Sequence, residues 1–161
     1  RFEVVVGPNA RQPGNLDLRA ELVEVHLHPQ YNAERPTDPD ADIAVAIAPF
    51  DLDVPLFAHR GSPPPASLSN VRYVGYGAKV TNDKGTRHDE AATIVSVDPG
   101  VIVMRAARNP CHGDSGGPLL ATIDGIPTIL AVGHIAYDEC NGGANYTRTD
   151  IYADFIASHL R

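Results

Sequence analysis

The sequence of 161 residues has the length of about one ordinary domain, and its 43% apolar and 20% charged residues are typical of a globular protein with a sizeable core. Thirteen Lys and Arg residues against twenty Asp and Glu residues give a net charge of -7. This balance argues against nucleic acid or an anionic membrane surface as a partner, because both are bound mainly through basic side chains.

Short apolar runs rich in β-branched residues recur along the chain, separated by Gly and Pro, which number fourteen each. Runs of this length between turn-forming residues predict strands. In chain order, the predicted strands are residues 2–6, 16–27, 43–47, 71–76, 93–97, 101–104, 118–123, 128–135 and 145–148. So many closely spaced short strands favour an all-β sandwich or barrel. No apolar run reaches the roughly 18 residues of a membrane-spanning helix.

Only the C-terminal end, residues 149–161, has helical periodicity. Its apolar residues recur on one face: Ile151, Tyr152, Phe155, Ile156 and Leu160. We expect this helix to be a packing element, with Thr149 or Asp150 as its N-cap. Three consecutive prolines at 63–65 hold an extended segment and predict a linker over residues 61–70. The expected units are therefore 1–60, 71–148 and the helix.

Residues 111–118 read Cys-His-Gly-Asp-Ser-Gly-Gly-Pro and form the most informative segment. Glycines permit backbone conformations that are closed to other residues, and they allow successive N–H groups to point at one place. A Ser in such a turn, beside a site for a developing oxyanion, is typical of nucleophilic catalysis. The alternative is a polar surface turn, which eight ordered positions make less favourable.

Residues 113–118 resemble the nucleophile motif of the trypsin/chymotrypsin family of serine proteases. Ala-Asp-Ile-Ala-Val at 41–45 resembles the segment that carries the family's catalytic Asp, and Val-His-Leu-His-Pro-Gln-Tyr at 25–31 resembles the stretch before it. Val-Gly-Tyr-Gly at 74–77 and Tyr-Thr-Arg at 146–148 resemble the opening and closing of the second barrel. The resemblance spans essentially the whole chain. It implies a trypsin-like double β-barrel, with the first barrel incomplete here, followed by a C-terminal helix.

By this resemblance, Ser115 is the nucleophile and Asp42 orients the catalytic His. The N–H groups of Gly113 and Ser115 form the oxyanion hole. Asp114 resembles the buried carboxylate that pairs with the free N-terminus of an activated protease. No cofactor and no metal are implied.

The two cysteines, Cys111 and Cys140, fall where the family has a disulfide between the nucleophile loop and the wall of the substrate pocket. The alternative is a pair of buried free thiols. An oxidised pair indicates a secreted or periplasmic protein.

The resemblance also outlines a substrate pocket. Asn109 stands at its base, where trypsin-like members have Asp, so the main attraction for Arg or Lys side chains is absent. His112 is expected at the rim. The walls are expected to be formed by Ala136, Tyr137, Asp138 and Ala144. These residues depart from the usual ones and leave the specificity class open.

The family's Ala-His-Cys segment, which carries the catalytic His, has no counterpart in the sequence. None of the seven histidines has that context: His26, His28, His59, His88, His112, His134 and His159. His26 and His28 share one strand face, and we expect them to be solvated or packed rather than metal ligands.

The first half of the first barrel also has no counterpart, and a partial barrel leaves unpaired strand edges. We therefore expect a complementing N-terminal protease segment or chain to supply both the strands and the His.

The sequence thus predicts a serine endopeptidase that acts on peptide or protein substrates through an acyl-enzyme on Ser115, with a general-base His from outside this chain. The isolated chain is predicted to be inactive. The alternative is a catalytically inactive trypsin-like binding module, in which no His would approach Asp42 and Ser115.

Overall fold

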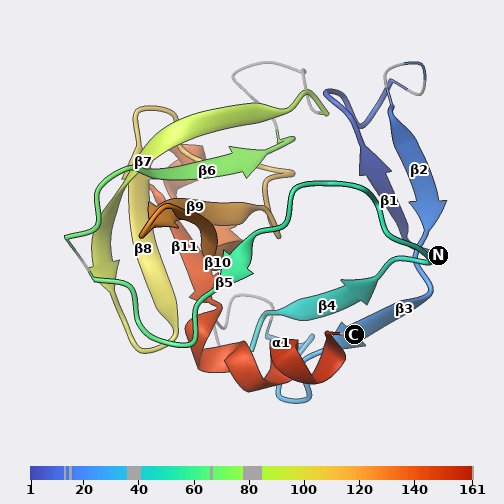
Figure 1. Ribbon diagram of the computed structural model, residues 1–161. Coiled ribbons are helices and arrows are strands. Elements are labelled where there is room, and N and C mark those ends of the chain that lie inside the picture. Colours follow the sequence, from blue (N-terminus) through green and yellow to red (C-terminus); the bar gives the residue numbers. More distant parts are fainter. Residues whose placement is uncertain (13, 15, 36–40, 66, 78–84, 161) are drawn as a thin grey trace.

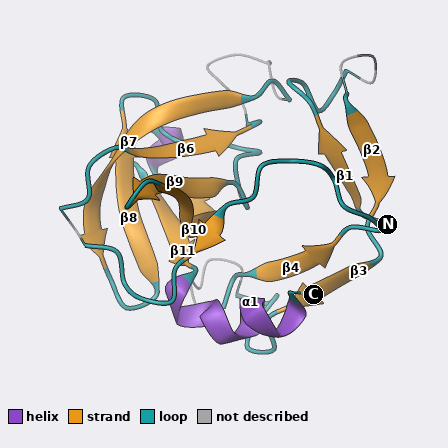
Figure 2. Ribbon diagram, viewed as in Figure 1, coloured by secondary structure: helices purple, strands orange, loops and turns teal. Residues whose placement is uncertain are grey.

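The computed structural model describes residues 1–12, 14, 16–35, 41–65, 67–77 and 85–160. A closed β-barrel occupies the C-terminal half, and two two-stranded sheets occupy the N-terminal half (Figure 1). Figure 2 shows that strands and loops dominate and that the clearest helix lies at the C-terminal end. The predicted all-β, trypsin-like architecture with a C-terminal helix is therefore confirmed.

The barrel is built from six strands, which are β6 (Val71–Gly75), β7 (His88–Val97), β8 (Val101–Ala106), β9 (Pro118–Ile123), β10 (Ile126–Ala136) and β11 (Ala144–Arg148). Their order is β11-β8-β7-β6-β9-β10, and pairing of β10 with β11 closes the ring. A short strand, β5 (Ala58–His59), adds to β10 in the parallel sense. Closure leaves no free edge between the six strands, which satisfies their backbone groups without an added segment.

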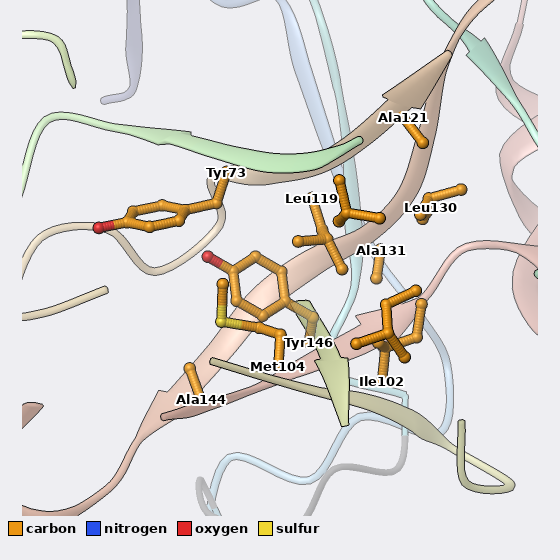
Figure 3. Close-up of a cluster of buried hydrophobic side chains, with 11 residues drawn as sticks. Tyr73, Ile102, Met104, Leu119, Ala121, Leu130, Ala131, Ala144 and Tyr146 are labelled. Atoms are coloured by element: carbon orange, nitrogen blue, oxygen red, sulfur yellow. The ribbon is translucent and has the colours of Figure 1, made fainter. Parts of the chain in front are cut away.

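The core lies inside this barrel because its strands alternate buried and outward-facing side chains. In β6, Val71, Tyr73 and Gly75 point inward, while the two residues between them are partly exposed. Figure 3 shows the apolar side chains that meet there. The buried cluster consists of Val71, Tyr73, Ile94, Ile102, Met104, Leu119, Ala121, Leu130, Ala131, Ala144 and Tyr146. This packed interior gives the loops at the barrel rim a rigid support.

The N-terminal half contains β1 (Glu3–Val6) paired with β2 (Leu18–Glu21), and β3 (Glu24–Leu27) paired with β4 (Ala44–Ile47), all antiparallel. Neither pair closes into a barrel. Several large apolar side chains of this half are exposed, namely Phe2, Val23, Val25, Leu27, Phe50, Leu56 and Phe57. Such a concentration of exposed apolar surface is unusual for a complete domain.

Two details of the predicted elements were wrong. The single strand expected over 16–27 is two strands, because the Leu22 amide donates to Phe2 and the Val23 amide donates to Ile47, so the chain passes from one sheet to the next. The expected N-caps also fail. Thr149 Oγ1 donates to strand carbonyls and the Asp150 carboxylate binds Arg148. A 3-10 turn, η3 (Asp150–Tyr152), therefore leads into α1 (Ala153–His159) without a side-chain cap.

The C-terminal helix packs against the sheet formed by β3 and β4. The Tyr152 hydroxyl accepts a hydrogen bond of 2.6 Å from the Ala41 amide. The His28 ring at the end of β3 lies edge-on to the rings of Tyr152 and Phe155, at 4.8 Å and 4.9 Å between ring centroids. These contacts fix the segment that carries Asp42 with respect to the barrel.

Candidate active site

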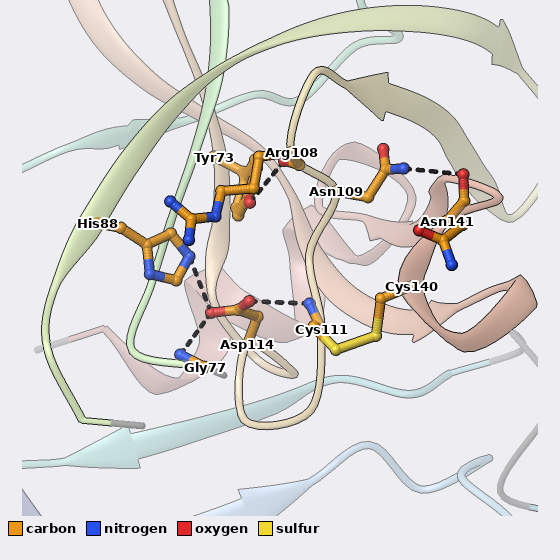
Figure 4. Close-up of a disulfide and its surroundings, with 9 residues drawn as sticks. All are labelled: Tyr73, Gly77, His88, Arg108, Asn109, Cys111, Asp114, Cys140 and Asn141. Carbon is orange, nitrogen blue, oxygen red and sulfur yellow. Dashed lines mark hydrogen bonds and ion pairs between the residues drawn. A yellow bond between two sulfur atoms is a disulfide. The ribbon is translucent and has the colours of Figure 1, made fainter. Parts of the chain in front are cut away.

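The loop between β8 and β9 presents Ser115 at the rim of the barrel. The disulfide between Cys111 and Cys140 ties this loop to a short 3-10 turn, η2 (Asp138–Cys140), which follows β10 (Figure 4). The predicted disulfide is therefore confirmed, and the alternative of two free thiols is wrong. The Gly116 amide donates to Gly133 of β10 at 2.8 Å, which fastens the other side of the loop.

Two amides of this loop remain available to a ligand. Within the described residues, the N–H groups of Gly113 and Ser115 donate no hydrogen bond, whereas the amides of Asp114 and Gly117 do. Gly113 has φ 101°, and a Cβ there would lie 3.2 Å from the Gly77 Cα. Only glycine fits this position without strain. The predicted oxyanion donors are thus exposed and unpaired, as binding of a developing negative charge requires.

Asp42 and Ser115 meet at one cavity although they are far apart in sequence. The cavity has a volume of about 380 Å³, and both residues line it together with Leu27, Tyr31 and Gly133. Asp42 comes from the loop before β4, and Ser115 comes from the loop before β9. The structure therefore brings together the two residues that the sequence predicted as orienting acid and nucleophile.

His134 is a residue of this site that the sequence analysis left without a role. Its Nδ1 lies 2.6 Å from Asp42 Oδ2, and its side chain is 1% exposed against 36% for Asp42. The β10–β11 register shifts between Gly133 and Ile135, so His134 is the extra residue of a β-bulge. Bulges re-aim a side chain from the regular alternation. Because a bulge carries no clear sequence signature, nothing in the sequence indicated this contact.

Asp114, next to the nucleophile, is buried within the chain as predicted. Its carboxylate accepts hydrogen bonds from the Gly77 amide at 2.7 Å and the Cys111 amide at 2.9 Å. His88 Nε2 lies 3.3 Å from Asp114 Oδ1 (Figure 4). Burial and the nearby Asp114 charge also raise the pKa of the Tyr73 and Tyr146 hydroxyls far above their usual range. The buried carboxylate is therefore contacted by polar groups from three separate segments of the chain.

A second cavity of about 320 Å³ adjoins Ser115 on the side of the disulfide. Of the residues predicted to form the substrate pocket, His112, Ala136 and Ala144 line it. Tyr137, Asp138 and Asn109 are not among its lining residues. Asn109 accepts from the Ala106 amide and donates to the Asn141 carbonyl, so both ends of its side-chain amide are engaged.

No ready metal site accompanies these cavities in the described part of the chain. Cys111, His112 and Cys140 are the one group of three potential ligands there, and the disulfide removes both thiolates. His26 Nε2 binds Glu24 at 2.8 Å, and the His28 ring packs on α1. Both histidines are thus engaged with protein groups, as the sequence analysis expected.

Comparison with known proteins agrees with this geometry. The sequence model of the Trypsin family matches residues 1–156, so the chain belongs to the trypsin family of serine proteases. Rabbit (Oryctolagus cuniculus) vitamin K-dependent protein C is 37% identical over 62 residues, which are 36% of this chain and 13% of that protein. The match therefore spans a small part of that relative.

The fold is similar to that of neuropsin, a serine protease expressed in the limbic system of mouse brain. The TM-score is 0.79 at 20% sequence identity, over 100% of this chain and 80% of neuropsin. At this identity the likeness shows the fold alone. Among the described residues, no helix is long and apolar enough to cross a membrane.

Proposed function

We propose that this chain is the larger part of a serine endopeptidase that hydrolyses peptide bonds through an acyl-enzyme on Ser115. The observation that carries the proposal is the convergence of a serine hydroxyl, two unpaired backbone donors and the Asp42 carboxylate on one cavity. Each group has a distinct part in acyl transfer, and surface turns do not require all three.

The general base comes from outside the 161 residues. Ser115 Oγ makes no hydrogen bond to any described residue, and Asp42 Oδ1 likewise accepts none within that part of the chain. Asp42 is 36% exposed at the cavity, which leaves room for a second imidazole beside the one of His134. A His delivered there would donate to Asp42 and accept the proton of Ser115.

The same segment would complete the N-terminal half. The apolar side chains of Val23, Val25 and Leu27 are exposed along β3, and Phe50, Leu56 and Phe57 are exposed after β4. A complementing segment that adds strands would cover this surface and bring the His with it. The isolated chain is therefore expected to be inactive.

The reaction then follows from these positions. Ser115 Oγ attacks the peptide carbonyl carbon while its proton passes to the external His, and the new oxyanion accepts from the Gly113 and Ser115 amides. The C–N bond breaks as the His returns the proton to the leaving amine, and water hydrolyses the ester. One such backbone donor stabilises the transition state by about 3 kcal/mol.

The substrate side chain would enter the cavity bordered by His112, Ala136 and Ala144. We assign Asn109 to the pocket base, where a neutral amide offers no ionic partner to Arg or Lys. The disulfide is typical of proteins that mature outside the cytosol, so we place the protease in a secreted or periplasmic setting.

A fluorophosphonate probe tests the function because it reacts only with an activated serine. We expect the protein that includes the His-bearing segment to be labelled at Ser115, and the 161-residue chain alone to remain unlabelled. Ser115→Ala supplies the blank. Absence of labelling in the complete protein, beside a labelled trypsin standard, would remove the proposal. Labelling of the chain alone would show that the base lies within it.

The alternative is a trypsin-like binding module without catalysis. The observation in its favour is that His134 already occupies Asp42 Oδ2. The residues upstream of Arg1 discriminate between the two functions. An Ala-His-Cys segment there favours the protease, and its absence from the mature protein favours the binding module.

A further inference from the structure

His88 lies beneath the nucleophile loop and is buried with Asp114. The side chains of His88 and Asp114 are 3% and 2% exposed, and His88 Nε2 lies 3.3 Å from Asp114 Oδ1. The function proposed above does not use His88. A carboxylate without a partner at this depth would be strongly destabilising, so the identity of its donors decides whether the loop is stable.

The backbone around Asp114 is shaped to receive this pair. Gly75 of β6 lies directly opposite His88 of β7 in the antiparallel register. A Cβ on Gly75 would come within 1.8 Å of Asp114 Oδ1, and one on Gly77 within 2.5 Å of its carboxyl carbon. Any side chain at either position would expel the carboxylate. The Val-Gly-Tyr-Gly segment therefore forms a cradle that only two glycines leave open.

We propose that His88 is a positioning residue that holds Asp114 and, through it, the oxyanion donors of Gly113 and Ser115. The proposal rests on the proposed function for its catalytic consequence and on the Asp114 contacts for its structural one. The Asp114 carboxylate accepts hydrogen bonds from the Gly77 and Cys111 amides, and His88 Nε2 lies within ion-pair distance of it at 3.3 Å.

The coupling to the oxyanion hole is covalent and short. Asp114 lies between Gly113 and Ser115 in the chain, so a backbone shift that accompanies release of its side chain from the cradle would turn both neighbouring amides. The Asp114 carbonyl also accepts from the Gly117 amide at 2.9 Å, which fixes the far side of the loop. Loss of the His88 contact would thus misplace the donors while the disulfide still holds the substrate pocket wall.

The other polar groups nearby do not replace His88. The Tyr73 ring lies edge-on to the His88 ring at 5.5 Å, and its hydroxyl donates to the Arg108 carbonyl. The Arg108 guanidinium binds Glu90 at 3.4 Å. The Tyr146 hydroxyl makes no hydrogen bond. Among the described residues, His88 is therefore the one side chain recorded within ion-pair distance of Asp114.

Three variants test the assignment in the complete protein. His88→Leu removes the donor at similar bulk, whereas His88→Gln keeps an N–H close to the Nε2 position. His26→Gln on β3 is the matched control, because His26 binds Glu24 outside the barrel. We expect His88→Leu to lower kcat by about tenfold to hundredfold with little change in KM, and His88→Gln to recover part of the loss. The control variant should behave as the parent protein.

A readout that does not depend on activity separates this inference from the proposed function. Hydrogen exchange of the Gly77 and Cys111 amides should accelerate in His88→Leu and not in His26→Gln, whether or not Ser115 is catalytic. Unchanged exchange and kcat in His88→Leu would overturn the assignment. A rise in KM that accounts for the whole loss of activity in His88→Leu would also contradict the assignment.

Discussion

His134 Nδ1 lies 2.6 Å from Asp42 Oδ2, which joins the bulge of barrel strand β10 to the loop that precedes β4. The contact connects two sheets that share no strand pairing. It fixes one oxygen of the carboxylate, and Asp42 also lines the cavity that contains Ser115. Asp42 is therefore held in place before any second imidazole arrives.

The first prediction concerns this pair. His134→Leu should lower the free energy of unfolding by about 2 kcal/mol, since a hydrogen bond to a charged group is lost and Asp42 is only partly desolvated. Asp42→Asn should cost less, because the amide oxygen can still accept from His134. Urea unfolding of the two variants measures both values. Equal stability of His134→Leu and the parent protein would contradict the proposed support of Asp42.

The second prediction concerns the Cys111–Cys140 disulfide, which closes a loop with a sequence separation of 29. Replacing both cysteines by Ser should destabilise the protein by about 3–4 kcal/mol in the chain-entropy model. Because the bond also anchors the loop of Ser115, fluorophosphonate labelling should slow in the same variant. Thermal unfolding with and without reductant gives the stability change. A reductant effect in the double Ser variant would point to a cause other than this bond.

The third prediction concerns Tyr146, whose hydroxyl is buried without a hydrogen-bond partner. Tyr146→Phe should leave stability at neutral pH unchanged or raise it, because an unsatisfied buried polar group is removed. Burial and the Asp114 charge raise the pKa of Tyr146 in the folded protein, so ionisation is easier in the unfolded chain.

Because Tyr146 ionises less readily in the folded protein, its contribution to the free energy of unfolding is complete below the unfolded pKa of about 10. That contribution is lost as pH rises above this value. The parent protein should therefore lose stability above about pH 10 more steeply than Tyr146→Phe. Parallel alkaline dependence in the two proteins would count against this reasoning. Unfolding by guanidinium at pH 8 and pH 11 makes the comparison.

The fourth prediction concerns the end of β11. Arg148 binds the Asp150 carboxylate through Nε at 3.0 Å and Nη2 at 2.6 Å, and its Nη1 donates to the Asp98 carbonyl at 2.8 Å. Both side chains are almost fully buried. Removing one partner of such a pair costs about 3–5 kcal/mol.

Arg148→Met should therefore destabilise the protein by an amount of that order, and Arg148→Lys should restore only part of it, because Lys lacks the two-pronged geometry. The paired replacement Arg148→Met with Asp150→Leu is the control, since it leaves no buried charge. Unfolding of all three variants distinguishes loss of the pair from loss of packing. If the change in unfolding free energy of the paired variant equalled the sum of the two single changes, Arg148 and Asp150 would not be energetically coupled.

The fold could be predicted from the sequence because its main signals are local. Short β-branched runs between Gly and Pro indicated the strands of the barrel, and the order of motifs from 25–31 to 146–148 indicated the trypsin-like arrangement. The disulfide followed from the position of the only two cysteines in that arrangement. Such signals survive in any context, because turn residues and apolar alternation act over a few residues.

The contacts of the site could not be predicted, because they depend on irregularities between distant segments. His134 reaches Asp42 through a bulge that shifts the β10 register by one residue. His88 reaches Asp114 because Gly75 and Gly77 leave a space that becomes visible only when β6 and β7 are paired. Thr149 and Asp150 are engaged by strand carbonyls and by Arg148, so tertiary partners override their local tendency to cap α1.

The tyrosine near the end of the chain has a consequence for how the protein can be shortened or fused. The Tyr152 hydroxyl accepts a hydrogen bond from the amide of Ala41, one residue before Asp42. Phe155 packs against the His28 ring, and His159 packs against the His26 ring. The C-terminal helix thus connects the barrel to the N-terminal half of the molecule. A tag or partner domain fused directly after residue 160 would therefore displace the segment that carries Asp42. A long flexible spacer would avoid this displacement.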